Sequence, residues 1–125
     1  MYYFSRAVPL PSGRRFREPA PPGGYGAWHG AELWYAFDTL ETKPFPWTPA
    51  DRAIAEAMSS AFVRFARTGN PGASWPAFKP QEPQAALIDE HRVHPAPLPN
   101  QAALAFFSSR FAETRKSRGV PAHAH

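Results

Sequence analysis

The strongest alternation of apolar and polar residues lies in the middle of the chain and predicts a long amphipathic helix. Thr48 is a suitable N-cap, Pro49 fits the first helical position, and Gly69 before Asn70-Pro71 ends the segment. The apolar positions that recur with helical spacing are Ala50, Ala53, Ile54, Ala57, Met58, Ala61, Phe62 and Phe65. The other side carries Asp51, Arg52, Glu56, Ser59, Ser60, Arg64 and Arg67. We expect the apolar face to pack on a sheet, which such stripes favour over the alternative of a cofactor contact.

Two further patterns predict strands, and one predicts a second helix. Residues 2–6 (YYFSR) are aromatic and β-prone, and residues 85–89 (AALID) form a short apolar run. A strand at residues 2–6 needs a partner, because an isolated strand leaves its backbone groups unpaired. Residues 101–114 carry apolar side chains at helical spacing, with Asn100 as the expected N-cap. The stripe of this helix consists of Leu104, Phe107 and Phe111, flanked by Ala103 and Phe106.

The segments between these elements are rich in proline and glycine. The chain has 16 prolines in 125 residues, well above the usual share of about 5%, so we expect much of it to be loop. Residues 7–25 form the longest such connector. We therefore divide the chain into one structured piece, residues 1–114, and a polar tail, residues 115–125, which we expect to be disordered.

Composition and charge narrow the possible functions only slightly. There is no cysteine, so a disulfide framework and a thiolate metal site are excluded. The net charge is a mild +4; the cluster Arg14-Arg15-Phe16-Arg17 could contact nucleic acid, but we interpret it as a solvated loop. His91 and His94 have the spacing of a metal pair but no third ligand nearby, so we interpret them as surface residues. No apolar run approaches the roughly 18 residues of a membrane span. We expect no nucleic-acid or membrane partner, and the cellular compartment stays open.

Candidate chemistry is concentrated in residues 26–37 (GAWHGAELWYAF). His29 stands between glycines, which let the backbone form a tight turn, and Leu33 and Tyr35 would anchor that turn to a core. A histidine on a rigid turn is suited to act as a general base. A lone histidine is also often a structural or surface residue, so this short pattern leaves both interpretations open.

The same segment resembles the part of the type-B carboxylesterases that carries the catalytic histidine. That family includes bacterial nitrobenzyl esterases and the cholinesterases, and its pattern is His-Gly-x-Glu-Leu followed by an aromatic pair and Phe. The resemblance implies that His29 is the histidine of a Ser-His-Glu triad, with Gly30 and Glu32 in supporting positions. The chain departs from the pattern at Trp34, where proline is frequent, and at Asp38, where a glycine usually ends the turn.

A second phrase resembles the same family, in the same order along the chain. It consists of residues 65–71 (FARTGNP) followed by residues 75–78 (WPAF). The resemblance implies an α/β class and the C-terminal portion of an α/β-hydrolase fold. Its elements would be two short strands, a short helix after the histidine loop, the long amphipathic helix and a C-terminal helix. Such a portion is incomplete as a domain, and residues 2–6 would be an interior strand of the sheet.

Several parts of a serine esterase are missing from the sequence. No Gly-x-Ser-x-Gly elbow occurs, and in α/β-hydrolases the serine and the triad acid precede the histidine along the chain. We therefore expect the C-terminal portion of a serine carboxylic-ester hydrolase, inactive alone, without cofactor or metal. Its partners would be the missing N-terminal part of the same hydrolase and a small-molecule ester. The alternative is a non-catalytic, standalone binding or scaffold module.

Overall fold

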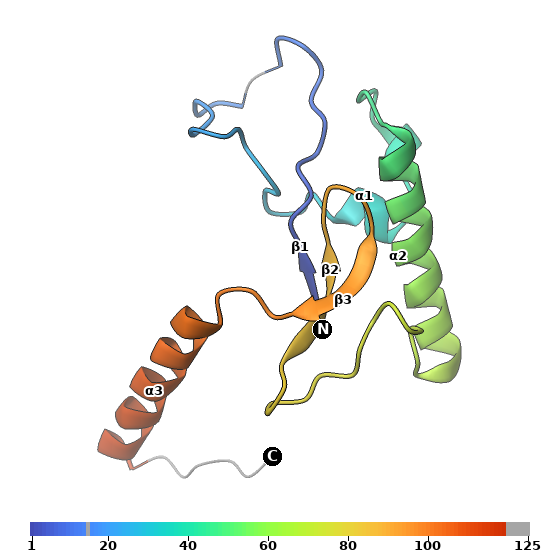
Figure 1. Ribbon diagram of the computed structural model, residues 1–125. Coiled ribbons are helices and arrows are strands. Elements are labelled where there is room, and N and C mark those ends of the chain that lie inside the picture. The colour runs from blue at the N-terminus through green and yellow to red at the C-terminus, as the bar shows by residue number, and fades with distance from the viewer. Residues whose placement is uncertain (15, 120–125) are drawn as a thin grey trace.

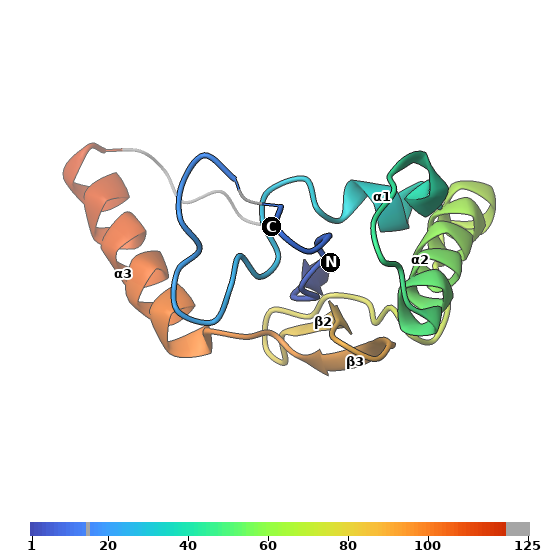
Figure 2. The ribbon, with the colours of Figure 1, turned by 90° about the horizontal axis from the view of Figure 1, so that it is seen from above.

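The computed structural model describes residues 1–14 and 16–119 as a small mixed α/β arrangement (Figure 1). In chain order its elements are β1 (Tyr2–Phe4), α1 (Leu33–Ala36), a short 3-10 helix (Leu40–Thr42), α2 (Pro49–Thr68), β2 (Gln84–Ile88), β3 (Val93–Pro97) and α3 (Gln101–Ser117). The sheet lies in the middle, with α2 on one side and α3 projecting from the other; both views show this (Figures 1 and 2). The predicted α/β class and the three predicted helices are confirmed.

The sheet has the order β1-β2-β3. β1 is parallel to β2, with Tyr3 opposite Leu87, and β3 is antiparallel to β2. The long connection between the two parallel strands contains both α1 and α2. The prediction of two strands was therefore incomplete: β1 ends at Phe4 rather than at residue 6, β2 begins one residue early, and β3 was missed. Within the part of the chain that the structure describes, β1 has β2 as its single partner.

The third strand escaped prediction because it contains two prolines. Proline cannot donate to a ladder and normally argues against a strand. Here Pro95 and Pro97 alternate with His94 and Ala96 on an edge strand. The backbone hydrogen bonds from Asp89 N to Arg92 O (3.2 Å) and from Leu98 N to Pro83 O (2.9 Å) flank β3. They show that the backbone N–H and C=O groups of the even-numbered residues of β3 point toward β2. Both prolines therefore direct their missing donors toward the open edge, where they cost no ladder bond.

Helix α2 begins and ends where the sequence predicts. The side chain of Thr48 accepts from Asp51 N and the carboxylate of Asp51 accepts from Thr48 N, which completes a capping box. Gly69 has φ +72° and ends the helix in the left-handed conformation that glycine adopts without a steric penalty.

The buried face of α2 differs from the predicted one. Ala53, Ala57 and Phe65 were expected inside and are exposed, whereas Ala55 and Asp51 are fully buried. Alanine carries little apolar area, so an alanine-rich helix does not fix its own rotation by hydrophobic pattern. The position of Asp51 is decided instead by hydrogen bonds, which are described below.

One hydrophobic cluster joins the sheet, α1 and α2. Its largest fully buried apolar side chains are Tyr35, Ile54, Met58 and Ile88. The whole cluster comprises Val8, Ala31, Tyr35, Ala36, Leu40, Ile54, Ala55, Met58, Ala61, Trp75, Ala86 and Ile88. Tyr35 therefore anchors the histidine turn to the core as expected, whereas Leu33 does not, because it is 51% exposed.

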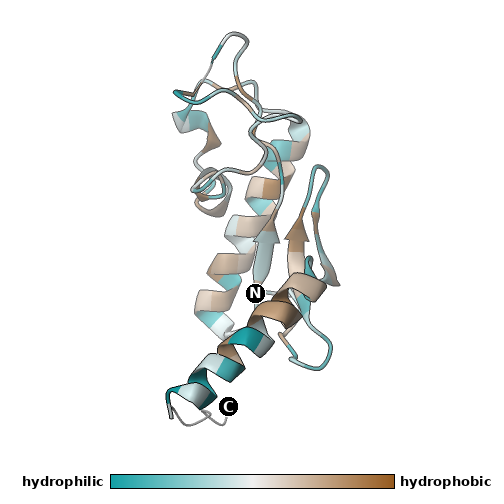
Figure 3. Cartoon of the chain, turned by 90° about the vertical axis from the view of Figure 1, so that its left-hand side faces the viewer, coloured by the Kyte–Doolittle hydropathy of each residue, from teal (hydrophilic) through white to brown (hydrophobic). Residues whose placement is uncertain are grey.

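Helix α3 has no buried residue. Leu104, Phe107 and Phe111 are 44%, 55% and 63% exposed, and Figure 3 shows the first part of the helix largely apolar and the part toward the C-terminus largely hydrophilic. Asn100 occupies the N-cap position with φ +59° but makes no side-chain cap bond. The helix runs to Ser117, three residues beyond its predicted end, and residues 120–125 of the predicted tail lie outside the described residues. No helix in the described part of the chain is long and apolar enough to cross a membrane.

Candidate functional site

His29 lies on a tight turn directly before α1. The backbone N–H of Ala31 donates to the carbonyl of Trp28 at 3.0 Å, so His29 and Gly30 are the two central residues of a β-turn. Gly30 has φ +80°, which is the value that a type II turn requires at its third position and that favours glycine. A Cβ atom would have room there, since its nearest neighbour would be a Leu33 carbon at 3.8 Å. The backbone angle, not space, makes glycine suitable, and the His29 side chain is exposed.

Glu32 is the N-cap residue of α1 and is half-buried. Its side chain makes no cap hydrogen bond. Burial raises the pKa of Tyr2, and the negative charge of Glu32 raises it further. None of the hydrogen bonds or ion pairs among the described residues joins Glu32 to His29.

The turn at the end of α1 preserves the shape that the sequence pattern assigns to a glycine. Asp38 has φ +51°, in the left-handed region. Aspartate and asparagine adopt this region more readily than other residues with side chains. The departure from the family pattern at this position therefore leaves a left-handed backbone in place.

A series of aromatic rings connects the histidine turn to the body. Trp28, next to His29, lies 6.4 Å from Trp34 between ring centroids, and Trp34 lies 6.1 Å from Trp47. Trp47 packs on Tyr35 at 5.8 Å, and Tyr35 packs on Phe4 at 5.2 Å. Most of these pairs have the edge-to-face geometry that aromatic rings prefer. The turn is thus held on both sides, by Trp28 before His29 and by α1 after it.

A buried polar cluster fixes α1 against α2 and β1. The carboxylate of Asp51 is fully buried and accepts from Tyr35 Oη at 2.7 Å and from Arg6 Nε at 2.5 Å. Its other oxygen accepts from the backbone N–H and the hydroxyl of Thr48, each at 2.7 Å. Arg6, 5% exposed, also donates to the carbonyl and the carboxylate of Glu90. One carboxylate therefore ties together the residues after β1, the helix that follows His29, and the start of α2.

The pKa values in this cluster follow from its hydrogen bonds. Burial by itself would raise the pKa of Asp51, but bonds from Arg6, Thr48 and Tyr35 outweigh burial and lower this pKa to about 2. Burial and the bond to Asp51 raise the pKa of Tyr35 well above its ordinary value. Burial would lower the pKa of Arg6, but the Asp51 carboxylate outweighs it and raises that pKa. The three groups keep one fixed charge state at neutral pH, so the cluster positions the turn and does not transfer protons.

Sequence patterns missed this cluster. Arg6 was assigned to a strand, Asp51 to the solvent side of a helix, and Tyr35 to a generic anchoring role. The one available signal was the sequence Thr48-Pro49-Ala50-Asp51, whose capping box directs the Asp51 carboxylate back along the helix toward its N-terminus. Nothing local to Arg6 indicates that it meets Asp51, 45 residues later.

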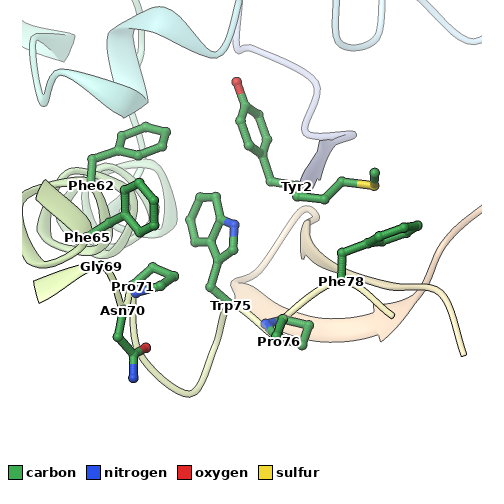
Figure 4. Close-up of a pocket in the computed structure, with 11 residues that line it drawn as sticks. Tyr2, Phe62, Phe65, Gly69, Asn70, Pro71, Trp75, Pro76 and Phe78 are labelled. Atoms are coloured by element: carbon green, nitrogen blue, oxygen red, sulfur yellow. The ribbon is translucent and has the colours of Figure 1, made fainter. Parts of the chain in front are cut away.

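A large apolar hollow lies near the start of β1. It has a volume of about 760 Å³, and Figure 4 shows Tyr2, Phe62, Phe65, Trp75 and Phe78 gathered around it. The rings of Phe62 and Trp75 are 5.5 Å apart, as are those of Tyr2 and Trp75. His29 is not among the described residues that line it.

Of the two histidines near the turn between β2 and β3, His91 is exposed as expected, whereas His94 is half-buried and its Nδ1 atom makes no hydrogen bond with the described residues. The Asp89 side chain accepts from the backbone N–H groups of His91 (2.8 Å) and Arg92 (3.0 Å). His94 Nδ1 lies 3.6 Å from the other Asp89 oxygen. Among the described residues, no group of three or more histidine, aspartate or glutamate side chains is placed to hold a metal ion.

Comparison with known proteins assigns the family. The model of the carboxylesterase family matches residues 1–107 of this chain. A bile salt-activated lipase from Mus musculus is 38% identical over 55 residues, which are 44% of this chain and 9% of the lipase. The chain thus spans a small part of the length of that relative. Because the family match covers far more than half of its residues, this chain belongs to the carboxylesterase family.

Proposed function

We propose that this chain is the C-terminal portion of a serine carboxylic-ester hydrolase with an α/β-hydrolase fold, and that His29 is its general base. The observation that carries the proposal is an exposed histidine on a type II turn, inside a segment that the family match covers. Gly30 gives the turn its shape. Glu32 has a supporting role at the start of α1 and is distinct from the triad acid, because in α/β-hydrolases the triad acid precedes the histidine along the chain.

The proposed chemistry is acyl transfer in two steps. His29 removes the proton from a serine hydroxyl as the serine oxygen attacks the ester carbonyl, and then gives that proton to the leaving alcohol. Water repeats the sequence on the acyl-enzyme, with His29 again taking and returning the proton. A glutamate would orient the second ring nitrogen, and backbone donors would stabilise the oxyanion. The sequence contains neither the Gly-x-Ser-x-Gly elbow nor the oxyanion loop. In this proposal these two parts and the triad glutamate come from the N-terminal part of the same hydrolase.

Three features support a larger sheet around this portion. β1 has one partner among the described residues, it is parallel to β2, and the connection between them carries helices. A parallel strand with helical crossovers is typical of a sheet with further strands. The apolar hollow beside Tyr2 and the exposed Leu104–Phe111 stripe are surfaces that a complete domain would cover. Within this proposal, the carboxylesterase piece extends through α3 to Ser117, a little beyond residue 114.

The isolated chain provides a first test of the proposal. We expect it to hydrolyse 4-nitrophenyl acetate no faster than free imidazole, because loss of triad partners costs several orders of magnitude in rate. Turnover well above imidazole that is abolished in His29→Ala would show that the chain carries its own nucleophile. That result would overturn the proposal of a dependent portion.

The second candidate is a non-catalytic binding or scaffold module. The apolar hollow favours it, because this hollow is built from aromatic residues and does not include His29. The two candidates differ in what they require of His29. A scaffold would tolerate His29→Ala without loss of any function, whereas the esterase proposal makes that residue essential in the complete enzyme.

A further inference from the structure

The long loop between β1 and α1 forms a second hollow, half-open to solvent, with a distinct chemistry. It has a volume of about 430 Å³ and is lined by Arg14, Phe16, Arg17, Pro19, Ala20 and Tyr25. This volume is within the range of small-molecule sites. Unlike the hollow near β1, it combines aromatic walls with two cationic side chains.

The aromatic wall is held in place by packing and hydrogen bonds. The ring of Phe16 lies 4.5 Å from that of Tyr25 and 5.1 Å from that of Trp28, with edge-to-face geometry in both pairs. Tyr25 Oη donates to the carbonyl of Glu18 at 2.7 Å and accepts from the Phe16 N–H at 3.4 Å. The loop is thus closed on itself, and the same Phe16 ring connects the hollow to Trp28, the residue before His29.

The two arginines have unused donors. The guanidinium of Arg14 stands 5.6 Å from the centroid of the Phe45 ring, a cation–π distance that anchors it to the body. Among the hydrogen bonds and ion pairs of the described residues, none involves the guanidinium of Arg14 or that of Arg17. A guanidinium that packs by its face keeps its edge N–H groups free to bind a carboxylate with two parallel bonds.

We propose that this hollow binds an aromatic carboxylate group, with the ring against Phe16 and Tyr25 and the anion on Arg14 and Arg17. Resting on the proposed function, the hollow would be the subsite that selects esters whose acyl or alcohol part carries such an acid. A hollow of about 430 Å³ has room for a single substituted ring. Nucleic acid would instead require an extended groove with cations along it. The hollow is linked to His29 through Phe16, whose ring packs on Trp28, the residue before His29.

The test measures binding by the chain itself and needs no turnover. Benzoate is titrated into the chain at low ionic strength, and amide chemical shifts of residues 13–28 are followed by NMR. Benzyl alcohol serves as the neutral match and inorganic phosphate as the anion without a ring. We expect saturable shifts with benzoate only, weakened by added salt. Arg14→Gln and Arg17→Gln should each weaken binding about two- to fivefold, the effect expected for one solvent-exposed ion pair.

Two controls separate this proposal from the esterase proposal. Arg67→Gln removes the same charge from the far end of α2 and should leave the titration unchanged, as should His29→Ala. Equal binding of benzoate and benzyl alcohol, or of benzoate and phosphate, would overturn the proposal. Benzoate shifts that persist in both arginine variants, tighter binding of a single-stranded oligonucleotide, or a chain without a dispersed spectrum would overturn it as well. None of these results depends on whether His29 is catalytic.

Discussion

Asp51→Asn should destabilise the chain far more than loss of an exposed carboxylate. Four donors converge on the two Asp51 carboxylate oxygens, and the residue is fully buried. Asparagine offers one oxygen and one NH2 group, so two of these donors would face another donor. The side chain of Arg6, 6% exposed, would lose its buried counter-ion.

The size of the expected loss in unfolding free energy depends on which partner Arg6 keeps in Asp51→Asn. Breaking a buried ion pair by removing one partner costs about 3–5 kcal/mol. Here the Glu90 carboxylate stays 3.1 Å away but is largely in solvent, so we expect a loss of about 2–4 kcal/mol. This is a large part of the total stability of a small domain, which is about 5–15 kcal/mol.

Urea unfolding followed by the helical circular dichroism signal measures this effect. Glu41→Gln is the matched control, because it neutralises the exposed carboxylate of the Arg52–Glu41 pair and should change little. A variant Asp51→Asn that has already lost its helical signal without urea agrees with the prediction. A loss under about 1 kcal/mol, or one equal to that of the control, would refute the view that this cluster holds α1 and the histidine turn.

Three further predictions use the same unfolding assay. The pKa of Asp51 is lowered from 3.8 to about 2. Ionised Asp51 therefore adds about 2 kcal/mol to the free energy of unfolding above pH 5, and this contribution is lost as the pH falls toward 2. A difference in unfolding free energy between the original chain and Asp51→Asn that stays constant down to pH 2.5 would contradict this. Gly30→Ala should cost about 1 kcal/mol, because φ +80° strains any residue with a Cβ; an unchanged midpoint would show that the turn relaxes freely. Deletion of residues 101–125 should leave the midpoint unchanged, because α3 buries no side chain; a lower midpoint would show that α3 packs on the body in solution.

The sequence predicted the elements that depend on local chemistry. Helix α2 has a cap, a proline and a glycine at its ends, and each of these acts within a few residues. The turn at His29 depends on Gly30 in the same way. These features were predictable because their causes lie next to one another in the chain.

The features that were missed depend on contacts between distant segments. β3 is a strand only because β2 provides a partner that tolerates Pro95 and Pro97 on the open side. Asp51 is buried because Arg6 and Tyr35 reach it from other elements. The apolar stripe on α3 has the pattern of a buried face, but none of the described residues covers it. Periodicity indicates which residues share a face and does not indicate what packs on that face.

The most direct test of the central claim is functional complementation. A carboxylesterase-family enzyme that lacks its own histidine-bearing C-terminal segment is co-expressed with this chain, and hydrolysis of 4-nitrophenyl acetate is measured on the copurified complex. We predict that the original chain restores hydrolysis and that His29→Ala lowers the rate by about a thousandfold or more. A copurified complex that is inactive with the original chain, or equally active with His29→Ala, would contradict the assignment of His29 as the general base.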